Sequence, residues 1–162
     1  MKSEIPLNPY DSCRLLAINL YSYVVNPFTD KAYFDTGKFF KHVIYAQRLM
    51  DDLVDLEIEK LDKIIDKIKS DPEPYSVKEV ELELWTNIRD KAIRGRRTGL
   101  GITGEGDMLA ALGLRYGTTE ATEQSESIHK NMAIQSYISS ITMAAERGSF
   151  TIWDKDKDLQ SD

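Results

Sequence analysis

Apolar residues recur at intervals of three and four along most of this chain, a spacing that places them on one face of an α-helix. The pattern predicts long helices at residues 36–70, 76–92 and 119–147 and a short helix at residues 106–114. Before the short helix, the apolar, Gly-containing run 98–103 predicts a buried strand. The sequence therefore predicts a mostly helical chain with few strands.

Polar and glycine residues mark the predicted helix ends. Asp35 or Thr36 can cap the first helix through its side-chain oxygen. Ser76 followed three residues later by Glu79 forms a capping-box arrangement at the start of the second helix. Gly148 suits the position after the last helix, where a left-handed backbone is common.

The first 35 residues are rich in turn-forming residues and harder to interpret. The apolar stretch 15–25 is compatible with a strand or a buried helix. Residues 13–19 lack β-branched enrichment, so a helical turn is at least as well supported there. A single strand at 98–103 needs neighbours that pair its backbone groups. These neighbours could come from the N-terminal region, from another chain or from a larger sheet.

Composition narrows the class of protein. The chain has 162 residues, 41% apolar and 30% charged, which fits one globular domain. Its net charge of −6 does not favour general nucleic-acid binding. No apolar run approaches the roughly 20 residues of a membrane span, and no secretory signal is visible. The single Cys excludes an internal disulfide framework and a thiolate-rich zinc site, and it suits the cytoplasm.

Two short motifs have alternative interpretations. Residues 99–104 match G-x-G-x-x-G but lack the second strand of a dinucleotide-binding unit, so close backbone packing explains them better. Residues 51–55 match D-D-x-x-D, which binds magnesium diphosphate in isoprenoid synthases, but no second acidic cluster is placed to face it. A solvated acidic helix face is the simpler explanation. His42 and His129 are isolated, so we predict no metal site.

Longer runs of residues carry a family resemblance. Residues 3–7, 11–20, 95–114 and 146–150 resemble the large, catalytic subunit of ribonucleotide reductases, most closely the adenosylcobalamin-dependent type. The resemblance implies that residues 1–153 are a partial reductase domain, a fragment of the ten-stranded α/β barrel of that family. The remaining residues, 154–162, then form a charged C-terminal tail.

The resemblance also implies site residues. Glu4 lies where the family has a general base that accepts a proton from the substrate 3′-hydroxyl. Cys13 lies where the family has one of two cysteines that reduce the ribose and become a disulfide. Lys2 stands where the radical-carrying cysteine is expected, so the chain would begin inside an active site without the group that starts the reaction.

These assignments lead to two functional hypotheses. In the first, the chain is part of a reductase that converts a ribonucleotide to a 2′-deoxyribonucleotide by a radical mechanism. It is inactive alone, does not bind adenosylcobalamin alone, and meets a nucleotide only in a complete assembly. Its partners are then the remaining barrel segments or other copies of itself. In the second, it is a non-catalytic helical protein with an interaction or regulatory role.

Overall fold

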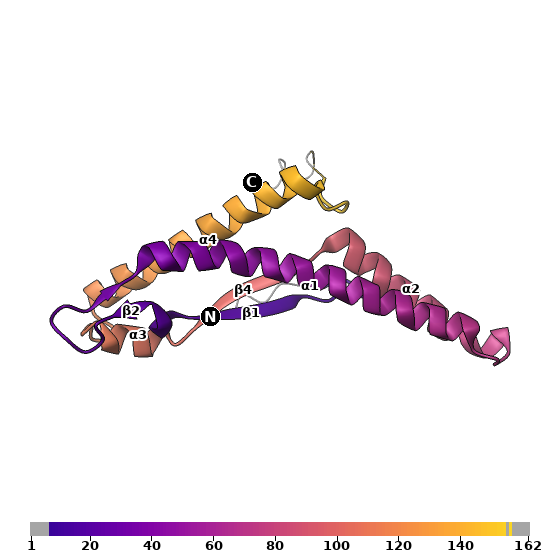
Figure 1. Cartoon of the computed structure of the whole chain (residues 1–162), viewed down its shortest axis with the longest axis horizontal. Helices are drawn as coiled ribbons and strands as arrows, with labels where there is room; N and C mark the ends of the chain where they lie inside the picture. The colour runs from indigo at the N-terminus through magenta and orange to yellow at the C-terminus, as the bar shows by residue number, and fades with distance from the viewer. Residues whose placement is uncertain (1–6, 155, 157–162) are drawn as a thin grey trace.

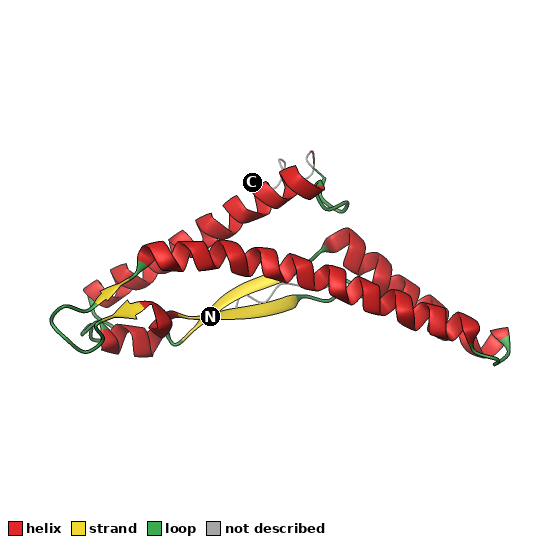
Figure 2. Cartoon of the chain, in the orientation of Figure 1, coloured by secondary structure: helices red, strands yellow, loops and turns green. Residues whose placement is uncertain are grey.

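The computed structural model describes residues 7–154 and 156. Helices dominate, and a small parallel sheet lies along the longest of them (Figures 1 and 2). The elements in chain order are β1 (Arg14–Asn19), the 3-10 helix η1 (Leu20–Tyr23), β2 (Val24–Val25), β3 (Tyr33–Phe34), α1 (Thr36–Ser70), α2 (Tyr75–Gly95), β4 (Thr98–Thr103), α3 (Glu105–Ala111) and α4 (Thr119–Arg147).

The parallel pair β1–β4 forms the centre of the fold. Its register aligns Arg14 with Thr98 and Asn19 with Thr103. One face of the sheet packs into the hydrophobic core through alternate side chains, as expected for extended strands. These side chains are Leu16, Ile18, Leu100 and Ile102. The predicted strand at 98–103 is therefore confirmed.

Residues 14–19 are a strand, so the helical turn considered for residues 13–19 is wrong. The reason is tertiary: pairing with β4 satisfies the backbone groups of β1 despite its modest intrinsic β-propensity. The short β2 and β3 pair antiparallel in a second sheet. The described residues thus contain one parallel pair, and the ten-stranded barrel implied by the resemblance is not seen in them.

An aromatic cluster fixes the start of α1 against the strands. The ring of Phe39 on α1 lies 5.3 Å from that of Tyr23 and 5.4 Å from that of Phe34, both edge-to-face. Phe39 is fully buried, and Asp35 caps the helix by accepting a hydrogen bond from the backbone N–H of Lys38. The predicted first helix is confirmed, and it continues without a break to Ser70.

The second helix begins differently from the prediction. It starts at Tyr75 after Pro74, and no side chain caps it, so the capping box at Ser76 and Glu79 is wrong. A proline ahead of the first turn explains this, because its fixed φ already favours helix entry. The third helix starts at Glu105, and the fourth runs to Arg147 as predicted, with Gly148 after it at φ 86°.

The apolar sides of α2 and α4 are only partly covered. On α2, only Ala92 is buried, while Val80 is 71% exposed. On α4, Tyr137 and Ile141 are 71% and 69% exposed, so its apolar side is buried only in part. Each of these two helices packs mainly against α1. No described helix is both long and apolar enough to cross a membrane.

Gly104 joins β4 to α3 and provides a test of the strand register. It has φ +70°, and a Cβ atom there would lie 2.5 Å from Oδ1 of Asn19. We expect Gly104→Ala to lower the free energy of unfolding by about 1–3 kcal/mol, because it adds left-handed strain and a clash. Urea unfolding followed by circular dichroism measures this.

Gly106 is the matched control, since a Cβ atom there meets nothing within 4 Å. Gly106→Ala should leave stability unchanged or raise it by about 0.5–1 kcal/mol, as expected inside a helix. Equal effects of the two substitutions would contradict the described junction.

Candidate functional site

The first candidate site lies where β1 and β4 begin. Cys13 directly precedes β1, beside Gly99 on β4. A Cβ atom on Gly99 would lie 3.4 Å from Sγ of Cys13 and 2.6 Å from Cδ2 of Leu15. The glycine therefore leaves room for the thiol to lie close to the neighbouring strand.

Two ion pairs hold the backbone on either side of Cys13. Asp11, whose side chain is 3% exposed, pairs with Arg97 just before β4. Arg14, whose side chain is 10% exposed, pairs with Glu57 on α1. The backbone N–H of Arg14 also donates to the carbonyl of Arg97 at 3.2 Å. Residues 11–14 are thus fixed to both β4 and α1, and the position of the thiol is well determined.

The surroundings of Cys13 keep its thiol protonated. Burial raises the pKa of the Cys13 thiol above its ordinary value. The guanidinium groups of Arg14 and Arg97 lower this pKa, but they do not outweigh burial, and Asp11 raises it further. A protonated thiol is a weak nucleophile at neutral pH and retains a hydrogen that it can transfer. Disulfide chemistry would need a second sulfur, and the sequence contains no other Cys.

The other residues that the resemblance points to lie elsewhere. Glu4 and Lys2 are outside the described residues, so the role predicted for Glu4 and the position predicted for Lys2 remain predictions. His42 is engaged by the hydroxyl of Tyr23, 3.0 Å from its Nδ1. Within residues 7–154 and 156, neither His42 nor His129 joins a group of possible metal ligands.

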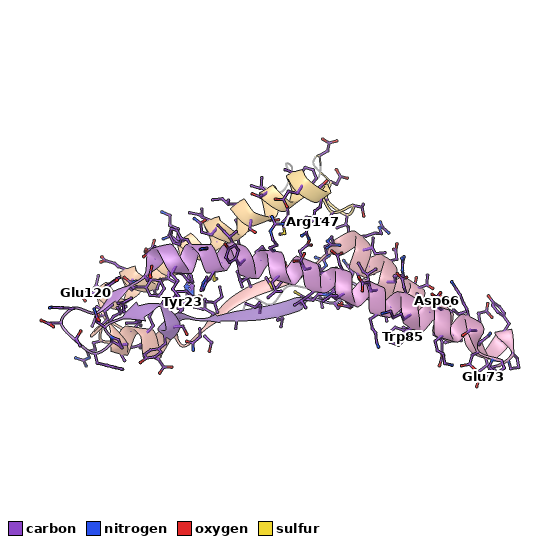
Figure 3. All side chains as sticks on the ribbon, in the orientation of Figure 1. Tyr23, Asp66, Glu73, Trp85, Glu120 and Arg147 are labelled. Atoms are coloured by element: carbon purple, nitrogen blue, oxygen red, sulfur yellow. The ribbon has the colours of Figure 1, made fainter. Side chains whose placement is uncertain are left out.

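A second cluster of charged residues connects three helices. Asp51 on α1 accepts hydrogen bonds from Nε of Arg96 and from a terminal nitrogen of Arg147, each at 2.7 Å. Arg96 also donates to Asp55 at 2.7 Å, and Arg147 contacts Asp52 at 2.9 Å. Figure 3 shows Arg147 at the end of α4, next to α1. The cluster therefore fixes the ends of α2 and α4 to the middle of α1.

This cluster corrects the interpretation of the D-D-x-x-D motif. Carboxylate oxygens of Asp51, Asp52 and Asp55 lie within 4.8 Å of one another, a spacing that could suit a cation. Arg96 and Arg147 already donate to them, so arginine side chains neutralise the carboxylates. Asp51 is buried, so the alternative of a solvated acidic face is also wrong for this residue.

The protonation of Asp51 depends on these arginines. Burial raises the pKa of its carboxyl group, but the hydrogen bonds and charges of Arg96 and Arg147 outweigh burial and hold the pKa below its usual value. Asp51 is therefore ionised at neutral pH. The geometry suits a structural junction better than a proton-transfer site, for which a pKa near neutrality is favourable.

A cavity of about 790 Å³ lies beside this junction, between α1, α4 and the start of β4. Its polar side includes Arg96, Arg147 and Thr98, and Thr98 accepts a hydrogen bond from the amide of Gln47 at 3.1 Å. Its apolar side includes Phe150, Ile152 and Trp153, all partly exposed. The arginines are already paired with carboxylates, so the cavity offers no free charge among the described residues that would select a ligand.

The glycine motif at residues 99–104 has a structural role. It spans β4 and the turn into α3, but no strand follows α3 or α4 in the part of the chain that the structure describes. The second strand that a dinucleotide-binding unit requires is therefore not seen there. Gly99 and Gly104 instead accommodate Cys13 and Asn19 at the two ends of β4.

Sequence reasoning missed the residues that surround Cys13. Asp11 and Arg97 are far apart in sequence, as are Arg14 and Glu57, so no local motif connects them. The available signal was weak: a pair of arginines directly before an apolar strand, and charged residues on both sides of the single Cys. Such residues need counter-charges when a fold buries them.

Comparisons with known proteins identify relatives. The family model described as "Ribonucleotide reductase, barrel domain" matches residues 3–161. A vitamin B12-dependent ribonucleoside-diphosphate reductase of Thermoplasma acidophilum is 31% identical over 153 residues, covering 93% of this chain and 16% of that protein. A protein of the same name from Mycobacterium tuberculosis is 26% identical over 147 residues, covering 91% of this chain and 17% of that protein. No solved structure matches the chain significantly. The chain thus spans about a sixth of the length of these relatives.

Asp11 provides a test of the charges around the thiol. The carboxylate of Asp11 neutralises Arg97, and its negative charge raises the pKa of the Cys13 thiol. The substitution Asp11→Asn removes both effects. We expect the pKa of Cys13 to fall and alkylation by iodoacetamide at neutral pH to become about threefold faster. The single Cys makes this rate easy to measure across a pH series. Asp30→Asn, in an exposed loop, is the control and should leave the rate unchanged.

Asp51 gives a pH-dependent stability test. The pKa of its carboxyl group is lower in the folded chain, so its ionised form stabilises the fold above its unfolded pKa of about 3.9. That stabilisation is lost as the pH falls through the lower, folded pKa. We expect Asp51→Asn to lower the free energy of unfolding by about 2–4 kcal/mol at pH 7. The difference from wild type should shrink below about pH 4 in urea titrations; a difference that is independent of pH would contradict this assignment.

Proposed function

This chain belongs to the ribonucleotide reductase family, to the barrel domain, and we propose that it forms part of a barrel in which a ribonucleotide is reduced to a 2′-deoxyribonucleotide. The observation that carries the proposal is the parallel pair β1–β4 with Cys13 fixed at its start. By analogy with the names of the curated relatives, the substrate is a ribonucleoside diphosphate. The chain does not catalyse the reaction alone.

Cys13 supplies one of the two thiols that reduce the ribose. Two thiols give two electrons and two protons as they form a disulfide, and the ribose 2′-hydroxyl leaves as water. Burial keeps the Cys13 thiol protonated, as this role requires, although the guanidinium groups of Arg14 and Arg97 lower its pKa. The second thiol comes from another barrel segment, because this sequence has a single Cys. Glu4 acts as the base that accepts the proton of the 3′-hydroxyl.

Adenosylcobalamin is the cofactor implied by the names of the relatives. The residues of this chain do not fit a complete site for its chemistry. The single Cys is already placed in the reducing pair, and Lys2 stands at the position of the radical-carrying cysteine. The imidazole of His42 is hydrogen-bonded to the hydroxyl of Tyr23. We therefore assign cofactor binding and radical formation to other segments of the assembly.

The exposed surfaces of this chain explain why other segments are needed. Both strands of the parallel pair have an outer edge without a strand partner among the described residues, and such edges favour pairing with further strands. The side chains of Tyr137, Ile138 and Ile141 form an exposed apolar face on α4. Covering such a face contributes roughly 25 cal/mol per Å² of apolar area. Part of this gain offsets the translational freedom lost on association, so a large interface is needed.

The alternative function is a non-catalytic helical interaction protein that keeps the reductase fold. The exposed apolar residues of α2 and α4 favour binding to another protein surface. The two hypotheses differ in whether Cys13 and Glu4 affect turnover in a completed barrel. They also differ in whether assembly requires reductase segments at all.

Complementation tests the proposed function. The chain is mixed with polypeptides carrying the remaining barrel segments, adenosylcobalamin, a dithiol and a ribonucleoside diphosphate. We expect a stable complex with turnover, and no turnover from the chain alone. Cys13→Ser should abolish dithiol-dependent turnover without weakening assembly, because the change conserves size. Glu4→Gln should reduce turnover, by about 10²-fold or more for loss of a general base.

Asp30→Asn is a control that should change neither assembly nor turnover, since Asp30 lies in an exposed loop. Light scattering measures the complex, and chromatography measures the deoxynucleotide. Folded pieces that fail to associate would favour the interaction-protein hypothesis. Turnover by the chain alone, abolished by Cys13→Ser, would contradict the proposal that other segments are required.

A further inference from the structure

The hairpin formed by α1 and α2 extends well beyond the sheet (Figure 1). In this part of the molecule α1 and α2 lie side by side, apart from the other described elements, and Leu61, Ile65 and Ile68 of α1 are buried. Arg89 of α2 pairs with Asp62 of α1 and fixes the two helices together. The far part of the hairpin is therefore a defined structure that does not contact the region around Cys13.

One side of this hairpin contains a groove of about 370 Å³ between the helices. Its apolar lining consists of Ile64 and Ile68 from α1 and Trp85 from α2. Figure 3 shows Trp85 on this projecting part. Tryptophan is enriched among residues that dominate binding energy in protein interfaces, because it offers a large, rigid contact area. The groove is therefore suited to receive an apolar side chain.

Three lysines border the groove on the α1 side. Lys60, Lys63 and Lys67 are three and four residues apart and share one helix face, spanning roughly 10 Å along the axis. Lys67 pairs with Asp71 in an exposed contact, whereas Lys60 and Lys63 have no ion pair within the described part of the chain. Glu81 lines the opposite side. The lining of the groove thus carries three positive charges and one negative charge, while Glu59, Asp62 and Asp66 alternate with the lysines along α1 outside the lining.

We propose that this groove, defined by Lys60, Lys63, Lys67, Ile64, Ile68 and Trp85, binds an acidic amphipathic segment of a partner protein. An apolar side chain of the segment packs on Trp85 between the two isoleucines. Carboxylates about one helical turn apart pair with Lys60 and Lys63. The binding does not depend on reductase chemistry, because none of these residues contacts the region around Cys13.

The charges of the groove and of the whole chain favour a protein segment over a nucleic acid. A phosphate backbone would meet Glu81 inside the groove and an acidic protein around it. A protein segment can place its carboxylates only opposite the lysines and keep its apolar residues against Trp85. Such charge complementarity gives specificity and a fast, salt-dependent association.

The test uses the full chain with Trp153→Phe, so that Trp85 is the only fluorescent tryptophan. The probe is a synthetic helical peptide in which a central leucine is flanked by glutamates one turn away on each side. We expect the peptide to shift the emission of Trp85, with binding weakened by 0.5 M NaCl. The same peptide with glutamines should bind about tenfold more weakly, as expected for two or three exposed charge pairs.

The substitutions Lys60→Glu and Lys63→Glu, made together, should weaken binding of the acidic peptide by more than tenfold. The matched control is Lys38→Glu with Lys41→Glu, which reverses two charges at the same spacing on the same helix, outside the groove. The control should bind the peptide as the parent does. Circular dichroism checks that both variants remain helical.

Several outcomes would overturn the proposal. They are no change in Trp85 emission with the acidic peptide, equal binding of the glutamine peptide, or equal losses in both double variants. Tighter binding of a single-stranded oligothymidylate than of the peptide would assign the groove to nucleic acid instead. A change in Trp85 emission with protein concentration alone would assign it to a second copy of this chain.

Discussion

The arrangement of this molecule depends on one buried carboxylate. Asp51, in the middle of α1, receives Arg96 from the junction of α2 and β4 and Arg147 from the end of α4. Arg96 adopts a left-handed backbone, and its side chain also binds the carbonyl of Asp51 at 3.0 Å. The point at which β4 begins is thereby fixed relative to α1. The register of β4 against β1, which places Gly99 beside Cys13, follows from that starting point.

The sequence predicted the helices and β4 because their signals are local. The apolar stripe of α1 lies within that helix, and its capping residue Asp35 directly precedes it. The β1 strand was harder, since Arg14–Asn19 has few β-branched residues and becomes a strand through a partner far along the chain. Periodicity also predicted an apolar side on α4, but Tyr137, Ile138 and Ile141 of that side are exposed, because periodicity does not show whether the chain covers it.

In the candidate site, too, the long-range contacts were not predicted from the sequence. Cys13 was found through a family resemblance. The ion pairs of the flanking Asp11 and Arg14 were not predicted, because their partners are distant in sequence. The D-D-x-x-D motif was given a surface or metal-binding interpretation because a motif shows the acids without the arginines. Once folded, Arg96 and Arg147 bind these acids. A charged motif therefore acquires its role from counter-charges that only the tertiary structure supplies.

The two exposed apolar surfaces differ in chemistry, and this difference separates their roles. Tyr137, Ile138 and Ile141 on α4 form an apolar face that resembles the interior of a larger domain. Such a face suits a permanent contact, because permanent interfaces are the more hydrophobic ones. The groove beside Trp85 combines a smaller apolar area with lysines, whose charged groups are well solvated when a partner dissociates. Salt should therefore weaken contacts at the groove while leaving contacts at α4 largely intact.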